Sequence, residues 1–439
     1  MREEIKKFVG EFLQEIKNKN IRIVSHYDTD GISSATILIK TMKRLNKKFS
    51  VRIVKGIDEN IINEELKRPE KEILLFSDLG SSNVEDFSKT NSKVFIIDHH
   101  EIKKENMGGN VFILNPHLNK KENLCSAALC YLFSKEISPF NKDLSKLALL
   151  GMVGDRHESE ITKSYYEIIK DCEDIEIKKS LLIFSATRPL KRALEYSTTF
   201  YIPGITGFSE GVNELLKEIG IQENKSLHEL DENETSKLIT RIMLKKGRNF
   251  SEEEILGNIF ITNFFNRKED LREISVLVNA CSRLGFPDLA ISFCMEKEGF
   301  YERAQEIYIK YRRELIDSLK NFERLEKING NGFVILNGKE KIKDAIIGTV
   351  CSIISSSNIY DKGTILIGMA YNNDKIKISA RVVGKSDKNL KQVLEKAVCN
   401  IKADVGGHKE AAGCLIRKED EKIFIEEIKK NLEIELIKV

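Results

Sequence analysis

The chain has 439 residues, 41% of them apolar, and at about 150 residues per domain this length predicts roughly three domains, or two with a large insertion. The 71 basic and 68 acidic side chains leave a net charge of +3, which excludes a polybasic arm that binds nucleic acid by bulk charge. With only 26 glycines and 6 prolines, the composition excludes collagen-like and disordered chains.

The chain begins with a predicted amphipathic helix over 1–17, in which acidic and basic side chains are mixed. This segment lacks the apolar run of a secretion signal, and no stretch of the chain approaches the roughly 18 apolar residues of a membrane span. The eight cysteines form no C-x-x-C pair. We therefore expect a cytoplasmic protein with reduced, buried thiols and no membrane partner. Abundant lysine and glutamate, with no tryptophan, fit a thermophilic archaeon.

Short runs of β-branched residues follow and alternate with stretches that favour helices. The runs cover 21–25, 49–55, 72–77, 93–97 and 111–114, and a helix is expected over 32–45. This alternation predicts a mostly parallel sheet with helices on both faces. Ligands of such sheets bind at the carboxyl ends of the strands, so the residues that follow each run are the first candidates for a site.

The rest of the chain predicts a helical region and then a smaller module. Helices are expected within 122–200 and from about 210 to 326, including one over 251–260 that Ser251 and Glu254 would cap and a long one over 301–325. Strand patterns return at 333–337, 364–371 and 375–383, between helices at 341–355 and 389–401. The predicted fold is α/β, with a Rossmann-like parallel-sheet domain over 1–210, a mainly helical middle region over 211–328 and an α+β domain over 329–439.

Acidic and histidine side chains gather after three of the predicted strands and after the apolar run that ends near residue 154. They are His26, Asp28, Asp30, Asp78, Asp98, His99, His100 and Asp155. Each aspartate taken alone is equally well explained as the cap of a following helix. Together at one sheet edge, carboxylates and imidazoles favour Mn²⁺ or Mg²⁺. Two such ions about 3.5–4 Å apart would clamp a phosphate oxygen during hydrolysis.

The motifs H-x-D-x-D-G, D-x-G, D-H-H and G-D, in this order, resemble those of the DHH phosphoesterases, and particularly the archaeal RecJ-like nucleases. Further similar segments are 115–116, 125–128, 187–190, 201–204, 279–285, 378–381 and 406–408. The resemblance covers nearly the whole chain. It implies a DHH catalytic domain at the N-terminus and a DHHA1-type substrate-binding domain over 329–439.

The resemblance also implies a role for each residue of the predicted site. One ion would be held by His26, Asp28 and Asp78, and the second by Asp30, Asp78, His99 and Asp155. Adjacent residues at a strand end face opposite ways, so His100 is expected to touch the scissile phosphate while Asp98 orients its neighbours. His157 follows closely after Asp155. Two positions stay open for it, one lining the cleft and one at the surface, and the surface position is favoured.

In the C-terminal domain, the resemblance implies a clamp for the substrate. Arg381 would offer a planar fork to phosphate oxygens, and Gly406 and Gly407 would let the backbone approach a phosphate closely. His408 would hydrogen-bond the phosphate or the terminal nucleotide.

These features lead to one main hypothesis: a Mn²⁺- or Mg²⁺-dependent exonuclease that hydrolyses single-stranded DNA or RNA by a two-metal mechanism. Replication, repair or RNA-processing proteins would be its partners. Three alternatives stay open: a phosphodiesterase for short oligonucleotides or cyclic dinucleotides, a replication-complex subunit with a mainly scaffolding role, and an inorganic pyrophosphatase of type II. The long middle region disfavours the small-substrate phosphodiesterase. The complete set of acidic positions disfavours the scaffolding role, and the spacing of the first motif disfavours the pyrophosphatase. Neither the direction of digestion nor the preferred sugar is readable from the sequence.

Overall fold

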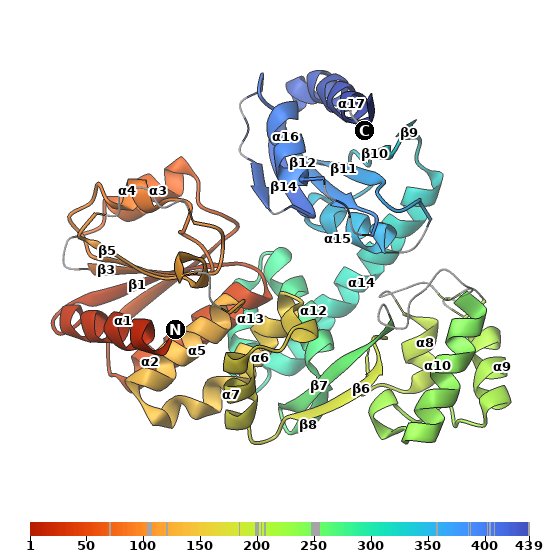
Figure 1. Ribbon diagram of the computed structural model, residues 1–439, viewed down its shortest axis with the longest axis horizontal. Coiled ribbons are helices and arrows are strands. Elements are labelled where there is room, and N and C mark those ends of the chain that lie inside the picture. Colours follow the sequence, from red (N-terminus) through yellow and green to blue (C-terminus); the bar gives the residue numbers. More distant parts are fainter. Residues whose placement is uncertain are drawn as a thin grey trace. The chain divides into compact units, whose positions relative to one another are not determined.

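The computed structural model describes residues 1–69, 72–102, 108–119, 122–183, 185–197, 202, 204–205, 208–246, 255–356, 359–384, 386, 388–401, 403, 405–407 and 409–437 (Figure 1). The chain divides into two compact units. The first comprises Met1–Tyr196 and Gly207–Tyr308, and the second comprises Ser197–Thr206 and Ile309–Val439. The predicted domain boundaries at residues 210 and 328 stay a prediction.

The first unit is built around a five-stranded parallel sheet with the order β2-β1-β3-β4-β5. Its strands are β1 (Asn20–His26), β2 (Phe49–Val54), β3 (Glu72–Ser77), β4 (Val94–Ile97) and β5 (Val111–Leu114). The helices that follow or precede them are α1 (Arg2–Glu15), α2 (Thr29–Arg44), α3 (Glu59–Leu66), α4 (Val84–Phe87), α5 (Ser126–Ile137), α6 (Ser145–Gly154) and α7 (Lys163–Asp171). The predicted parallel sheet and its five strands are confirmed.

Both faces of this sheet are buried because its strands are apolar in nearly every position. Ile23 and Leu75 point into the core formed with α1, α2 and α5, while Val24 and Leu74 point into the core formed with α3 and α4. Alternate strand residues face opposite sides, so continuous apolar runs require helices on both faces. Figure 1 shows α3 and α4 on one side of the sheet and α1, α2 and α5 on the other.

The rest of the first unit is mainly helical but contains a three-stranded antiparallel sheet with the order β6-β7-β8. Its strands are β6 (Glu176–Leu181), β7 (Leu256–Phe264) and β8 (Arg267–Asp270), and its helices are α8 (Leu190–Glu195), α9 (Ser209–Ile219), α10 (Glu232–Lys246), α12 (Leu271–Arg283), α13 (Pro287–Cys294) and α14 (Phe300–Arg324), the last of which continues into the second unit. The helix predicted over 251–260 is therefore wrong from Leu256 onward, and its predicted cap lies outside the described residues. β7 pairs with β6, some 80 residues earlier in the chain, which a local pattern does not reveal.

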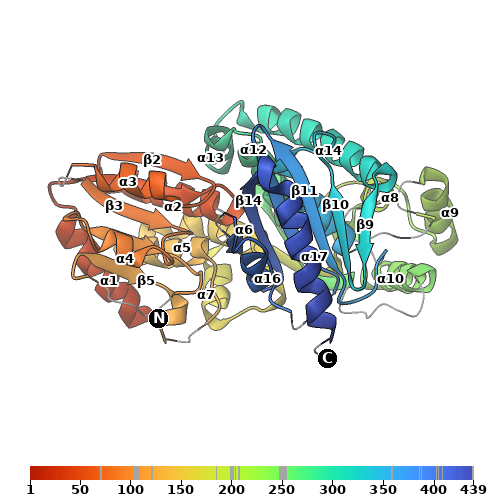
Figure 2. The same ribbon diagram turned by 90° about the horizontal axis from the view of Figure 1, so that it is seen from above.

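The second unit is built on a six-stranded sheet with the order β13-β14-β12-β11-β10-β9, in which only β10 and β11 are parallel. Its elements are β9 (Lys327–Gly330), β10 (Phe333–Asn337), α15 (Asp344–Ser355), β11 (Ile365–Asn372), β12 (Lys375–Val382), α16 (Leu390–Ala397), β13 (Val405–Gly407), β14 (Ala411–Arg417) and α17 (Glu421–Ile437). The strands and helices predicted for this α+β module are confirmed. One face packs against α16 and α17, through residues such as Ile335 and Phe424, and Figure 2 shows α17 lying along the strands.

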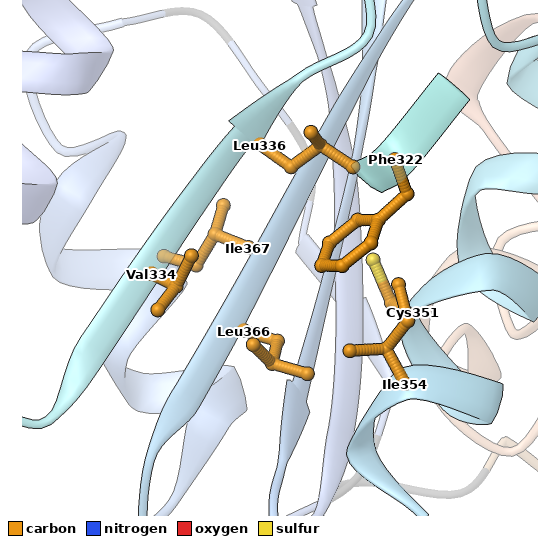
Figure 3. Close-up of a pocket in the computed structure, with 7 residues that line it drawn as sticks. All are labelled: Phe322, Val334, Leu336, Cys351, Ile354, Leu366 and Ile367. Carbon is orange, nitrogen blue, oxygen red and sulfur yellow. The ribbon is translucent and has the colours of Figure 1, made fainter. Parts of the chain in front are cut away.

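The other face of this sheet packs against α15 and the end of α14. Val334, Leu336 and Leu366 meet Phe322, Cys351 and Ile354 around a hollow of about 10 Å³ (Figure 3). The hollow is lined only by apolar side chains. A buried water needs at least this much space and two or more polar partners, so the hollow is a dry packing gap.

Two further predictions concern the chain as a whole. Across the helices of the described residues, none combines the length and the apolar character needed to cross a membrane. All eight cysteines are free thiols, and seven of them are buried as predicted, whereas Cys399 is exposed.

Candidate metal centre

Three parallel strands end side by side where the sequence places its acidic and histidine side chains. β1 ends at His26, β3 at Ser77 and β4 at Ile97, and these strands are neighbours in the sheet. Residues that follow parallel strands emerge at the same edge of a sheet. The C-terminus of α6 reaches this edge too and adds Asp155.

A first cluster joins the ends of β1 and β3. His26 Nδ1 lies 3.0 Å from Asp28 Oδ2 and 3.4 Å from Asp78 Oδ2. Asp28 also caps α2, because its Oδ1 accepts the backbone N–H of Gly31 at 3.0 Å. Capping and site formation therefore use different oxygens of the same carboxylate.

Asp78 lies between this first cluster and a second one. Its Oδ1 lies 3.5 Å from His99 Nε2 and accepts a hydrogen bond from the Ser126 hydroxyl at 3.1 Å. The backbone φ of Asp78 is 59°, in the left-handed region that costs a non-glycine residue about 1–3 kcal/mol. This conformation brings a carboxylate that is only 2% exposed between His26 and His99.

The second cluster joins the end of β4 to the end of α6. His99 Nε2 lies 3.2 Å from Asp155 Oδ2. A nitrogen of His157 completes a group of three ligand atoms within 4.8 Å of one another. The surface position expected for His157 is wrong, because its half-buried ring packs beside His99 and its Nδ1 lies 3.0 Å from the Tyr165 hydroxyl oxygen.

Asp98 and His100 form a hydrogen-bonded pair beside these clusters. Asp98 is buried, and its Oδ1 lies 2.7 Å from His100 Nδ1 and accepts the backbone N–H of His99 at 2.8 Å. Its Oδ2 accepts the backbone N–H of Ser81 at 3.0 Å. The side chain of Asn115 donates to the carbonyl oxygen of His100 at 2.9 Å. These contacts fix the D-H-H turn in one conformation.

Strand alternation predicted that the rings of His99 and His100 point to opposite sides. In the structure they do not. Their centroids lie 4.7 Å apart, and both residues offer a nitrogen to a group with Asp78. β4 ends at Ile97, so the alternation of an extended strand no longer applies at residues 99 and 100.

Asp30 has a different surrounding from the other aspartates. Its two oxygens accept the backbone N–H groups of Ser126 and Ala127, at 2.7 and 2.8 Å, at the N-terminus of α5. A helix N-terminus stabilises a nearby anion. Asp30 thus connects the start of α2 to the start of α5. Among the described residues, Asp30 belongs to none of the groups of three potential ligands whose ligand atoms lie within 4.8 Å of one another.

The charges of the two clusters are strongly coupled. Burial and the Asp78 carboxylate raise the pKa of Asp30 to about 7, and burial together with Asp30 raises the pKa of Asp155. Burial lowers the pKa of His26 and His99, but the carboxylates around them outweigh it and hold both pKa values well above the usual range. Without a cation these groups are balanced by protons, and a divalent cation would replace those protons.

The donor atoms present fit a hard divalent cation. Among the buried polar atoms of the described residues that make no well-formed hydrogen bond, three belong to the clusters: His26 Nδ1, Asp78 Oδ2 and Asp155 Oδ2. Each of them faces an atom of opposite charge at 3.0–3.4 Å. Each is a potential ligand atom, and unsatisfied buried polar atoms are costly unless something binds them. Carboxylate oxygens mixed with imidazole nitrogens suit Mn²⁺ or Mg²⁺.

A helix of the middle region holds the first motif in place. The Oδ1 of Asn279 accepts the backbone N–H of Thr29 at 3.0 Å, and the carbonyl oxygen of Ser275 accepts the Thr29 hydroxyl at 2.9 Å. Thr29 lies between Asp28 and Asp30. The segment 279–285 therefore has a structural role at the site through α12.

The residues predicted to clamp the substrate belong to the second unit. Arg381 lies on β12, where its guanidinium donates to the Ser352 hydroxyl at 2.9 Å and to the Ala380 carbonyl oxygen at 2.7 Å. Gly406 and Gly407 are exposed on β13, and Gly407 has a φ of 119°. His408 lies outside the described residues, as do residues 201 and 203 of the segment 201–204.

Sequence reasoning missed the supporting groups of the site. His157 was considered as a cleft residue because it lies two residues after Asp155, but a surface position was favoured. The left-handed turn at Arg156 that directs its side chain has no sequence signal. Ser126 and Asn279 lie in segments that resemble the family, which was the available signal, but their partners are distant in the chain.

Comparison with known proteins finds three matches to protein families. Residues 20–152 match the DHH family, N-terminal domain; residues 183–255 match the DHH-CID domain; and residues 330–433 match the DHHA1 domain. The first match contains every residue of the two clusters except Asp155 and His157. The third contains Arg381, Gly406 and Gly407.

A curated relative and several solved structures align along almost the whole chain. Uncharacterized protein MJ0831 of Methanocaldococcus jannaschii is 28% identical over 444 residues, which cover 97% of this chain and 96% of that protein. RecJ of Thermus thermophilus, solved in complex with Mn²⁺, aligns with a TM-score of 0.61 and 15% identity, over 97% of this chain and 54% of that one. CDC45 of Entamoeba histolytica aligns with a TM-score of 0.69 and 13% identity, over 97% of this chain and 99% of that one. At such identities the likeness shows the fold, and the chain spans about half the length of the Thermus protein.

Proposed function

Because the chain belongs to the DHH superfamily, as its DHH, DHH-CID and DHHA1 domains show, we propose that it is a metal-dependent phosphoesterase that hydrolyses single-stranded DNA or RNA from one end. The observation that carries this proposal is the position of Asp78. Its two oxygens face His26 on one side and His99 on the other, so one carboxylate serves both clusters.

Each cluster would hold one divalent cation, with Mn²⁺ as the main candidate and Mg²⁺ as the alternative. His26, Asp28 and Asp78 would bind the first, and Asp78, His99 and Asp155 the second. Asp30 stays in the proposed second set, because each of its oxygens keeps a second lone pair beside its backbone hydrogen bond. When bound, two such cations activate an attacking water and neutralise phosphate charge. RecJ of Thermus thermophilus, which shares the fold, was solved with Mn²⁺ and with Mg²⁺.

The protein's own groups would orient the phosphate. The Asp98 carboxylate lies against His100 Nδ1. Burial alone would lower the pKa of His100, but this carboxylate outweighs burial and raises the pKa. Asp98 thereby fixes the orientation of the ring and favours its protonated form, in which the Nε2–H is the donor that we assign to the scissile phosphate. Asp98 acts through His100 and holds the turn by its other hydrogen bonds.

The second unit would bind the end of the strand. Arg381 presents a guanidinium that the Ser352 hydroxyl and a backbone carbonyl hold in place on β12. Gly406 has open space where a side chain would lie, so its backbone is accessible to a phosphate. Together with His408, these residues would retain a terminal phosphate or base, which favours digestion from an end.

A second candidate is a mainly scaffolding role in a replication complex. The likeness to CDC45, with a TM-score of 0.69 over 99% of that chain, is the observation that favours it. The complete pair of clusters favours catalysis, because a scaffold has no need of buried and unsatisfied ligand atoms.

The experiment is a digestion of single-stranded DNA and RNA labelled at either end, beside a dinucleotide and pyrophosphate, with Mn²⁺ or with a chelator. We expect stepwise shortening from one end in Mn²⁺ only. Asp78→Asn is expected to lower the rate by about 100-fold or more. Asp143→Asn, which removes an exposed partner of Arg44, is the matched control and should keep the rate.

Three other results would each overturn a different part of the proposal. Internal cuts alone would exclude exonuclease action, and hydrolysis of the dinucleotide or pyrophosphate alone would make the enzyme a small-substrate phosphoesterase. An intact protein that hydrolyses none of these substrates would leave the scaffolding role.

A further inference from the structure

We infer that His157 is an additional ligand of the second divalent cation and that Tyr165 is the residue that positions its ring. This inference rests on the proposed two-metal function and extends it to a ligand outside the family motifs. It also assigns a metal preference to the second position.

The geometry places His157 in the second cluster. One of its ring nitrogens lies within 4.8 Å of ligand atoms of both His99 and Asp155. The rings of His157 and His99 have their centroids 5.9 Å apart and are inclined at 66°. Because Nδ1 of His157 is taken by the Tyr165 hydroxyl, Nε2 is the nitrogen that would bind a cation.

The backbone between the two ligands is held in an unusual conformation. Asp155 caps the C-terminus of α6, and Arg156 follows with a φ of 60° and a ψ of 33° before the short 3₁₀ helix His157–Ser159. A left-handed conformation costs a residue such as arginine about 1–3 kcal/mol and persists where the surroundings require it. Here the turn directs Asp155 and His157 to the same place, which a regular helix end would not do.

Tyr165 connects His157 to the rest of the site. It lies fully buried on α7, and its hydroxyl oxygen accepts the backbone N–H of Cys125 at 2.9 Å. The next two N–H groups of α5 bind Asp30. A ligating histidine commonly donates its other ring N–H to a fixed acceptor, and the Tyr165 oxygen is in that position at 3.0 Å.

The additional imidazole makes the two positions chemically different. The first cluster has one histidine, His26, beside two carboxylates, whereas the second would have two histidines, His99 and His157. The carboxylates of the second set would be those of Asp30, Asp78 and Asp155. Imidazole ligands favour transition metals over Mg²⁺, and Mg²⁺ prefers oxygen ligands. We therefore assign the stronger preference for Mn²⁺ over Mg²⁺ to the second position.

The test is calorimetric titration of the metal-free full chain with Mn²⁺, and separately with Mg²⁺, without substrate. Wild type is expected to bind two Mn²⁺ ions. His157→Gln should weaken one of them by about 10–100-fold and leave the other unchanged, and Tyr165→Phe should weaken the same ion by about 10-fold. The change in Mg²⁺ affinity of His157→Gln should be within about threefold. His117→Gln, at an exposed histidine, is the matched control and should change neither ion.

The outcomes separate this inference from the proposed function. If wild type binds two Mn²⁺ ions and His157→Gln binds both with unchanged affinity, the inference is overturned and the proposed metal centre stands. If folded wild type binds no Mn²⁺, the proposed function fails and the inference fails with it. Circular dichroism of each metal-free variant checks its fold, and if His157→Gln does not fold, Tyr165→Phe decides by the affinity of the same ion.

Discussion

Asp78 shows how a single residue can determine the form of a site. The left-handed backbone at this position comes directly after β3, and it brings one buried carboxylate within reach of two histidines from different strands. Aspartate tolerates this conformation better than most residues. The position therefore needs both the charge of an aspartate and its backbone tolerance.

Away from the site, Glu65 is a buried residue whose substitution is expected to have a large effect on stability. It is 1% exposed and accepts two hydrogen bonds from Arg22, at 3.0 Å each, and one from Arg52 at 2.9 Å. Glu65→Gln would leave the buried guanidinium of Arg22 without its counter-charge. We expect the free energy of unfolding to fall by about 3 kcal/mol at neutral pH, measured by urea unfolding.

The loss should depend on pH in a defined direction. Burial acts to raise the pKa of Glu65, but the hydrogen bonds from Arg22 and Arg52 hold it below the ordinary value of 4.5. The stabilisation is thus complete above pH 4.5 and is lost as the pH falls through the lower pKa of the folded state. The difference between wild type and Glu65→Gln should shrink in that range. Glu64→Gln, at a 61% exposed partner of Arg52, should change stability by less than about 0.5 kcal/mol at any pH.

At the scale of elements, the N-terminus of α5 is the part that unites the site. Its first backbone N–H groups bind Tyr165 and Asp30, and its first side chain, Ser126, donates to Asp78. α6 runs beside this helix end, and Gly151 provides the space. A Cβ at Gly151 would lie 2.5 Å from the Cβ of Ala127 and would collide with the Asp30 carboxylate.

Gly151→Ala is therefore expected to separate α6 from α5 and to lower the free energy of unfolding by about 1–3 kcal/mol. Gly10→Ala is the matched control, because no atom lies within 4 Å of a Cβ at this exposed position of α1. There alanine should raise stability by up to about 1 kcal/mol through its helix propensity. Thermal unfolding of both variants measures the contrast, and equal shifts of the two would contradict the predicted collision.

The second prediction at this scale concerns α12. Asn279→Ala would remove the acceptor of the Thr29 N–H, which lies between two of the site's aspartates. A buried N–H left without a partner costs about 1–3 kcal/mol, and Mn²⁺ affinity should fall as well because Asp28 loses its fixed orientation. Asn63→Ala, on the exposed surface of α3, is the control for an asparagine in a helix. Unchanged stability and Mn²⁺ affinity in Asn279→Ala would exclude the anchoring role.

The elements of the sheets were largely predictable, and the reason is periodicity. The apolar runs of β1 to β5 and the strands around β11 and β12 have enough β-branched residues to be read locally. The first half of β7 was predicted as part of a helix over 251–260, because Ser251 and Glu254, which precede the strand, have the spacing of a helix cap. The pairing of β7 with β6 depends on a segment far away in the chain. A local pattern therefore predicts a strand or helix best where the element does not depend on pairing with a distant segment.

At the scale of the whole molecule, each compact unit has its own apolar core, and the two candidate clusters lie in the first unit only. A ligand that binds only the native state stabilises the part that binds it. We expect calorimetry to resolve two unfolding transitions. Mn²⁺ at about 100 times its dissociation constant should stabilise one of them by about 2.7 kcal/mol. Asp78→Asn should lose this stabilisation. A shift of both transitions by the same amount would contradict the assignment of the metal to the first unit.

The predicted site and the observed clusters agree in their centre and differ at their border. His26, Asp28, Asp78 and His99 lie close together because they follow parallel strands, which is a rule of the fold and was available from sequence. Asp155 joins them from the C-terminus of α6. Asp30, His100 and His157 take positions that depend on backbone turns and on helix ends from elsewhere in the chain. Such turns are set by tertiary packing, which no spacing of residues encodes.

The common direction of the five strands has a practical consequence. Chain segments that enter the strands lie at the far edge of the sheet, and exposed Lys48, directly before β2, is one of them. With Cys399→Ser removing the exposed thiol and the other seven cysteines buried, Lys48→Cys would provide one accessible attachment point. A molecule tethered to a glass surface or labelled with a dye through this point would keep the edge with the candidate metal centre open to solution, which suits single-molecule measurements of ligand binding.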